Sequence, residues 1–158
     1  MLDWNKIKQK ASEFYEEASK KIKQYTPEAF SKEKKFINAI VISMALMTIA
    51  DKKVETEEVV KSIDLIKDIE EIQEMNMVQE ALELYEFHLA ELEKAMNDGE
   101  AKLTLKIETL LMDIEKIKEY QGYPQMIKTL LDYIMEADGN IDPKEIDMKN
   151  RILKVLDL

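Results

Sequence analysis

The chain of 158 residues contains no cysteine, only three glycines and three prolines, and one histidine. Without cysteine the protein has no disulfide bonds, thiolate metal sites, iron–sulfur clusters or cysteine nucleophiles. Its one histidine, His88, excludes a zinc site built from several histidines of one chain. Glycine and proline are the usual turn residues, and their scarcity leaves few places for tight turns. Leu, Met, Glu and Lys are abundant and favour helices, so the sequence predicts an all-α protein.

Long hydrophobic runs are also missing. No apolar run approaches about 18 residues without a charge, so no transmembrane helix is predicted. The first ten residues alternate charged and apolar side chains and lack the apolar centre of a signal peptide, so a cytoplasmic location is expected. Hydrophobic residues make up 46% of the chain and charged residues 35%, which is typical of one soluble globular domain.

The charge is unevenly distributed along the chain. The net charge is −10, yet residues 1–35 carry nine Lys against six Asp or Glu. The remaining residues are therefore strongly acidic, with twenty-seven Asp or Glu against fourteen Lys or Arg. Nucleic acid is not an expected partner, because its phosphates repel such a surface. Cations and basic protein surfaces are the expected partners.

Apolar residues recur with helical spacing throughout, and no segment shows the two-residue alternation of a strand. The "FINAIVISMALMTIA" stretch is apolar on nearly every face, which indicates a helix in the centre of the domain. We expect a single compact domain over residues 27–158, preceded by an amphipathic helix within residues 1–26. Seven helices are predicted, over residues 3–25, 27–50, 56–72, 75–97, 101–120, 125–137 and 143–156.

The amphipathic N-terminal helix has three possible roles. Its apolar stripe would pack on the core, lie on a membrane surface or bind a partner protein. The segment's nearly balanced charge weakens the case for peripheral membrane contact, but the sequence leaves all three roles open.

Two stretches of the chain resemble each other, "MTIADKKVETEE" at 47–58 and "IMEADGNIDPKE" at 134–145. Their shared pattern is A-D-x-x-[VI]-[ED]-x-x-E, and each copy joins an apolar helix to an amphipathic one. The repetition predicts a domain of two pseudo-symmetric halves.

The segments "ADGNIDPKE" and "ADKKVETEE" resemble the paired motifs of the tellurite-resistance protein TerB family, and the similarity covers roughly residues 27–158. The resemblance implies an all-helical TerB-like fold and a non-enzymatic role in tellurite resistance, stress response or phage defence. It also implies an acidic, cation-binding surface. The family usually has glycine after the motif aspartate, whereas the first copy here has Lys52.

The acidic residues of the motifs admit two interpretations. The first is a weak site for Ca²⁺, Mg²⁺ or Mn²⁺, since these ions prefer oxygen ligands. An EF-hand is excluded, because counting from Asp138 its sixth and twelfth positions would be Pro143 and Lys149. The candidate metal ligands are Asp51, Glu55, Glu58, Asp138, Asp142 and Glu145.

The second interpretation is structural. Asp142 is a good N-cap, Pro143 suits the first helical position, and Glu145 can complete a capping box. Gly139 would supply a positive φ, and Thr56 is the N-cap expected in the first copy. Lys52 and Lys53 could neutralise the acidic residues without any metal ion.

The sequence favours a non-enzymatic protein that binds cations or partner proteins through its acidic face. Two alternatives stay open: a metal-dependent enzyme that uses the same carboxylates, and an adaptor without an ion site. We interpret His88 as a packed core residue with one hydrogen bond. Met44, Met47, Met112 and Met135 are expected to fill the core.

Overall fold

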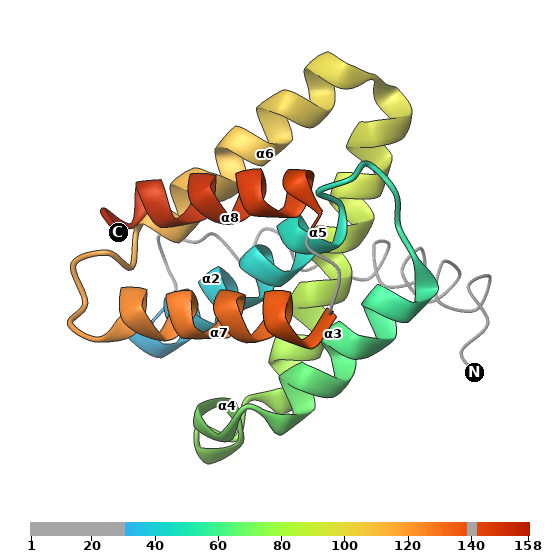
Figure 1. Cartoon of the computed structure of the whole chain (residues 1–158). Helices are drawn as coiled ribbons and strands as arrows, with labels where there is room; N and C mark the ends of the chain where they lie inside the picture. Colours follow the sequence, from blue (N-terminus) through green and yellow to red (C-terminus); the bar gives the residue numbers. More distant parts are fainter. Residues whose placement is uncertain (1–30, 139–141) are drawn as a thin grey trace.

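A computed structural model of the protein describes residues 31–138 and 142–158. Within these residues the chain forms seven helices and no strand (Figure 1). The predicted all-α fold class is therefore confirmed. The helices are α2 (Lys32–Thr48), α3 (Thr56–Asp68), α4 (Glu70–Glu74), α5 (Val78–Asp98), α6 (Glu100–Glu115), α7 (Tyr123–Asp138) and α8 (Pro143–Val155).

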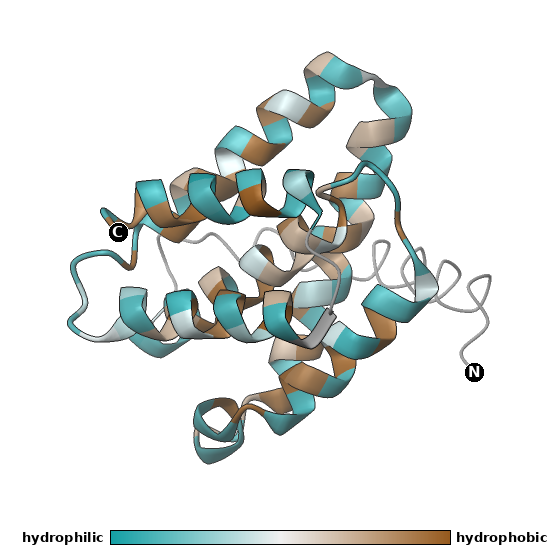
Figure 2. Cartoon of the chain, viewed as in Figure 1, coloured by the Kyte–Doolittle hydropathy of each residue, from teal (hydrophilic) through white to brown (hydrophobic). Residues whose placement is uncertain are grey.

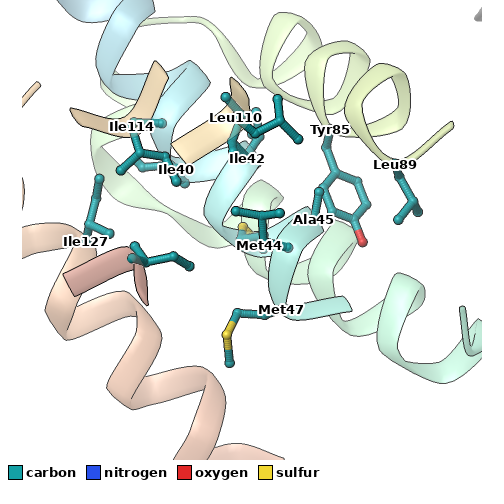
Figure 3. Close-up of a cluster of buried hydrophobic side chains, with 14 of the residues drawn as sticks. Ile40, Ile42, Met44, Ala45, Met47, Tyr85, Leu89, Leu110, Ile114 and Ile127 are labelled. Carbon is teal, nitrogen blue, oxygen red and sulfur yellow. The ribbon is translucent and has the colours of Figure 1, made fainter. Parts of the chain in front are cut away.

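Helix α2 forms the centre of the molecule. Every side chain from Phe36 to Thr48 is buried, so after its exposed first turn this helix has no face in contact with water. Helices α3, α5, α6, α7 and α8 all pack against it. Figure 3 shows side chains from other helices, among them Tyr85, Leu110 and Ile127, gathered around α2. A helix that is apolar all round belongs in a domain centre, as the sequence predicted.

The outer helices bury only one face. Their hydrophobic and hydrophilic residues alternate along the ribbon (Figure 2). On α6, Leu103, Ile107 and Leu110 are buried, whereas Leu105 and Met112 are 69% and 65% exposed. The prediction that Met112 fills the core is wrong, because it lies on the solvent face of α6. Met44 and Met47 are buried as expected.

The start of α2 differs from the prediction. Ser31 has extended backbone angles, and its hydroxyl accepts a hydrogen bond of 3.2 Å from the backbone N–H of Lys34. Ser31 is thus the N-cap, and the helix begins at Lys32 rather than at residue 27. The ring of Tyr123 stacks on that of Phe36, with centroids 4.0 Å apart, and this contact ties the start of α7 to α2.

The predicted helix over residues 56–72 is divided into α3 and α4. Ile69 takes extended angles between them, and the Gln73 side chain donates a hydrogen bond to the Lys67 carbonyl at the break. Ile66 and Ile72 are both fully buried. In an unbroken helix these two residues would point about 120° apart, because each residue turns the helix by about 100°. The break lets both side chains reach one core.

The end of α6 and the N-terminal helix were also predicted from the sequence. Helix α6 ends at Glu115, and residues 116–120 form turns instead of the last turn of the predicted helix. The predicted amphipathic helix within residues 1–26, and with it the domain boundary, lies outside the described residues. In the part of the chain that the structure describes, no helix is long and apolar enough to cross a membrane.

A polar pair is buried between α2 and α5. His88 Nε2 lies 2.7 Å from Asn38 Oδ1, and both residues are almost fully buried. Because a carbonyl oxygen can only accept, Nε2 carries the proton and donates it. Nδ1 is then the basic nitrogen, and it is buried without a hydrogen bond to any described residue. Burial, with a smaller contribution from Lys106, lowers the pKa of His88 to about 3. The expectation of a packed histidine with one hydrogen bond is confirmed.

This pair predicts an acid-sensitive stability. The pKa of His88 falls from 6.5 in the unfolded chain to about 3 in the fold. The unfolded state therefore binds more protons between these values, so the contribution of neutral His88 to stability is fully present above pH 6.5 and is lost as pH falls towards 3. The loss is at most about 1.4 kcal/mol per pH unit. We expect His88→Gln to reduce this slope in urea unfolding experiments between pH 6 and 4, and equal slopes would contradict the prediction.

Candidate binding groove

A groove of about 310 Å³ lies between α3 and α7, and the end of α2 forms its floor. Helices α3 and α7 each pack against α2. Glu145, in the first turn of α8, also lines the groove. Its lining residues are Met44, Met47, Thr48, Glu58, Lys61, Ser62, Asp64, Leu65, Asp68, Tyr133, Ile134 and Glu145.

The lining combines an apolar floor with an acidic rim. Met44 and Met47 provide unbranched, polarizable side chains that adapt to different shapes. The lining contains four carboxylates, from two Glu and two Asp, and one cationic residue, Lys61. The lining therefore has a net negative charge beside an apolar floor.

Glu58 and Glu145, the last residues of the two motif copies, both line this groove. Each occupies the third position of its helix, since α3 begins after the N-cap Glu55 and α8 after the N-cap Asp142. The first turn of a helix favours a carboxylate, because the backbone N–H groups there carry partial positive charge. Glu145 is 8% exposed, and Oε2 of Glu58 is shielded from solvent. The repeated motif thus delivers one glutamate to the groove from each copy.

A chain of hydroxyl groups links the groove to the core. The Thr48 hydroxyl donates to the Met44 carbonyl at 2.9 Å and lies 3.0 Å from the Tyr85 hydroxyl. Thr48 has a single proton to donate, so Tyr85 donates to Thr48. Ser62 is hydrogen-bonded to Tyr85 as well. Burial, and to a smaller extent the negative charge of Glu58, raises the pKa of Tyr85 to about 12. Tyr85 therefore stays neutral and holds α2, α3 and α5 together below the groove.

The aspartates of the two motifs have structural roles. Asp142 is the N-cap of α8, and its Oδ1 accepts a hydrogen bond of 2.8 Å from the Lys144 N–H. Asp51 Oδ1 accepts a comparable bond of 3.0 Å from the Lys53 N–H. The capping interpretation of Asp142 is confirmed.

The first motif copy departs from the prediction at its cap. Glu55 has extended backbone angles and is the N-cap of α3, whereas Thr56 is the first helical residue. The prediction that Thr56 caps this helix is therefore wrong. Glu55 is exposed, and its side chain makes no capping hydrogen bond. The two copies thus share their glutamates in the groove but differ at the N-cap.

Lys52 does not neutralise the motif carboxylates as expected. Its Nζ lies 2.8 Å from Oε1 of Glu100 on α6, and this contact lowers the pKa of that carboxyl group. Lys52 has a φ of 61°, which is the left-handed conformation. The aligned residue of the second copy is Gly139, which lies outside the described residues.

The divalent-metal interpretation stays a prediction. Among residues 31–138 and 142–158, no three Asp, Glu or His side chains lie close enough together to hold a metal ion. Asp138 is the last residue of α7, and its side chain lies outside the described part of the structure. The described ligand candidates that come together in one site are Glu58 and Glu145.

Sequence reasoning missed the rest of the groove. Lys61, Leu65 and Asp68 follow Glu58 at helical spacing, which shows that one face of α3 lines the site. That spacing was visible in the sequence. The sequence did not show that this face of α3 borders a groove, because the position of α7 beside α3 follows from the packing of both helices on α2.

The capping role of Asp142 predicts a loss of stability on substitution. Asp142→Ala removes the acceptor for the Lys144 N–H and should lower the free energy of unfolding by about 0.5–2 kcal/mol. Asp142→Asn keeps a capping oxygen and should cost much less. Urea unfolding at pH 7 provides the measurement. Equal losses of unfolding free energy in the two variants would show that the charge of Asp142, rather than its capping hydrogen bond, stabilises the fold.

The hydroxyl chain predicts coupled losses. Tyr85→Phe removes the hydrogen bonds of the Tyr85 hydroxyl to Thr48 and Ser62 and should destabilise the fold by about 1–3 kcal/mol. Thr48→Val should lower the free energy of unfolding less in the Tyr85→Phe background than in the wild type, because both substitutions remove the same hydrogen bond. A double-mutant cycle in urea measures this coupling, which should reach at least about 0.5 kcal/mol. Additive losses would show that the two hydroxyls contribute independently.

Comparison with family models, with curated proteins and with solved structures finds no match to this chain. The resemblance of its motifs to the TerB family therefore stays a prediction. The groove and the residues that line it are the features of the described structure that bear on function.

Proposed function

We propose that this protein is a non-enzymatic binding protein whose groove takes up a cationic side chain of a partner protein. The observation that carries the proposal is the presence of Glu58, Glu145 and the two methionines in the lining of one groove. Two carboxylates match the charge of a lysine or arginine head group, and the floor accepts its aliphatic stem.

An organic cation suits this groove better than a hydrated divalent ion. Ca²⁺ takes six to eight oxygen ligands, whereas the described residues offer no cluster of three acidic side chains. Met44, Met47 and Leu65 add apolar surface that would not stabilise a hydrated ion. They would stabilise the methylene groups of a long basic side chain.

Several observations support a role without catalysis. The chain has no cysteine, and its one histidine is buried in the pair with Asn38 and has a pKa of about 3. Ser62, the serine of the groove, is hydrogen-bonded to Tyr85, whose pKa of about 12 makes it a poor base. A nucleophile needs an adjacent base to activate it, and Ser62 has none in Tyr85.

The proposed binding agrees with the role implied by the resemblance of the two motifs to TerB proteins. That role is a cytoplasmic stress response, with tellurite resistance and phage defence as the family's examples. The acidic surface attributed to the family corresponds here to the rim of the groove, and the proposed partner is a basic protein.

The proposal predicts binding of a small arginine mimic. We expect n-butylguanidinium to shift the ¹³C-methyl resonances of Met44 and Met47 in the full-length protein, because both side chains line the groove. The Met112 methyl group is the internal reference, since it lies on the solvent face of α6. Absence of a saturable shift at Met44 and Met47 would overturn the proposal.

Charge variants identify the binding residues. Glu58→Gln combined with Glu145→Gln should raise the Kd for n-butylguanidinium by about tenfold, which corresponds to ~1.4 kcal/mol. Asp98→Asn combined with Glu119→Gln removes the same charge outside the groove and should leave Kd nearly unchanged. A parallel titration with MgCl₂ tests the metal interpretation. Saturable methyl shifts with Mg²⁺ but not with n-butylguanidinium would favour a divalent site.

A further inference from the structure

Helix α6 carries an apolar stripe on its solvent face. Leu105 is 69% and Met112 is 65% exposed, and no other large hydrophobic side chain of the described residues is as exposed. The two residues are seven apart in the helix, so they point in nearly the same direction. Ala101, one turn before Leu105, is exposed on the same face. No element of residues 31–138 and 142–158 covers this stripe.

We propose that the chain's own N-terminal segment, within residues 1–26, docks as a helix along the stripe of α6. The inference is independent of the groove and goes beyond the proposed function. The sequence leaves three roles open for this segment, which are packing on the domain, contact with a membrane and binding of a partner. The proposal selects the first role and names the surface.

The start of α2, where the segment joins the described fold, lies beside the C-terminal end of α6. Lys32 Nζ is 5.4 Å from the centre of the Tyr120 ring, and Tyr120 follows the end of α6 by five residues. The start of α2 and the end of α6 both lie at the left of Figure 1. Met112 is only eight residues before Tyr120, so the segment enters the fold close to this end of the stripe.

The segment is long enough to cover the whole stripe. Residues 26–30 separate the predicted helix from the N-cap of α2, and five extended residues span up to about 17 Å. The helix predicted over residues 3–25 would measure about 34 Å, whereas the 16 residues of α6 measure about 24 Å. Because the segment joins at the C-terminal end of α6, it would run parallel to α6 along its length.

The apolar residues of the segment have the spacing of a helix that packs lengthwise on another. They recur alternately three and four residues apart, which keeps them on one face along several turns. The residues in this pattern are Trp4, Ile7, Ala11, Phe14 and Ala18.

The sizes of the side chains on the two helices are complementary. Ala11 and Ala18 are seven residues apart, as are Leu105 and Met112. A parallel register that sets Ala11 opposite Leu105 therefore also sets Ala18 opposite Met112. Each large side chain of α6 then meets a small one of the segment, so the two helices can approach closely.

The absence of cysteine makes disulfide cross-linking a direct test of this register. Ala11→Cys combined with Leu105→Cys should form a disulfide within one chain under mild oxidation, because facing positions bring the two sulfur atoms together. Ala18→Cys combined with Met112→Cys should do the same. Ala11→Cys combined with Thr104→Cys is the matched control and should stay reduced, since Thr104 is exposed but points about 100° away from Leu105. Non-reducing electrophoresis and thiol counting by mass spectrometry provide the measurement.

Trp4, the one tryptophan of the chain, gives a second readout. It shares the apolar face of the segment, so docking should shield it from acrylamide. Leu105→Glu should increase the acrylamide quenching of Trp4 fluorescence, because the docked segment would bury an unpaired carboxylate. Thr104→Glu adds the same charge at the neighbouring residue and should leave the quenching unchanged. Both residues are exposed in the described fold, so circular dichroism should show both variants folded.

Other outcomes would overturn the inference. Disulfides that join two chains would assign the stripe to a second copy of the protein. Equal cross-linking of Ala11→Cys with Leu105→Cys and with Thr104→Cys would show that the segment has no fixed place on α6. Trp4 quenching that ignores Leu105→Glu, and falls only when vesicles of phosphatidylglycerol and phosphatidylcholine are added, would assign the segment to a membrane surface.

Discussion

The burial of every side chain of α2 from Phe36 to Thr48 is the constraint on which the rest of the structure depends. A helix with no solvent face must be covered on every side, which is why five other helices pack against it. Its polar side chains must also find partners inside the protein, because an unsatisfied buried group is costly. Ser43 donates to the Ala39 carbonyl at 2.7 Å, Asn38 accepts from His88, and Thr48 accepts from Tyr85.

The groove is a consequence of the same constraint. Its floor is the last part of α2, so the methionines that line it belong to the most buried element of the fold. The hydroxyl chain from Ser62 through Tyr85 to Thr48 fixes α3 against that floor. The acidic rim is therefore carried by helices whose positions are set in the core, and a ligand would meet carboxylates that are already in place.

Much of the fold could be predicted from the sequence, because helical periodicity and full apolarity are local signals. The central position of α2, the N-cap at Asp142 and the packing of His88 all followed from such signals. The break at Ile69 did not, since it depends on where Ile66 and Ile72 meet the core. The repeat identified Glu58 and Glu145, but their meeting in a groove depends on how separate helices pack.

Lys52 shows that a residue other than glycine can follow the motif aspartate. The residue takes a left-handed backbone conformation, for which glycine is the usual choice, and its side chain reaches Glu100 on α6. A search pattern that demands glycine after the motif aspartate would overlook this copy. A lysine at this position also brings what glycine cannot, because its side chain joins the loop of the first motif copy to the start of α6 by an ion pair.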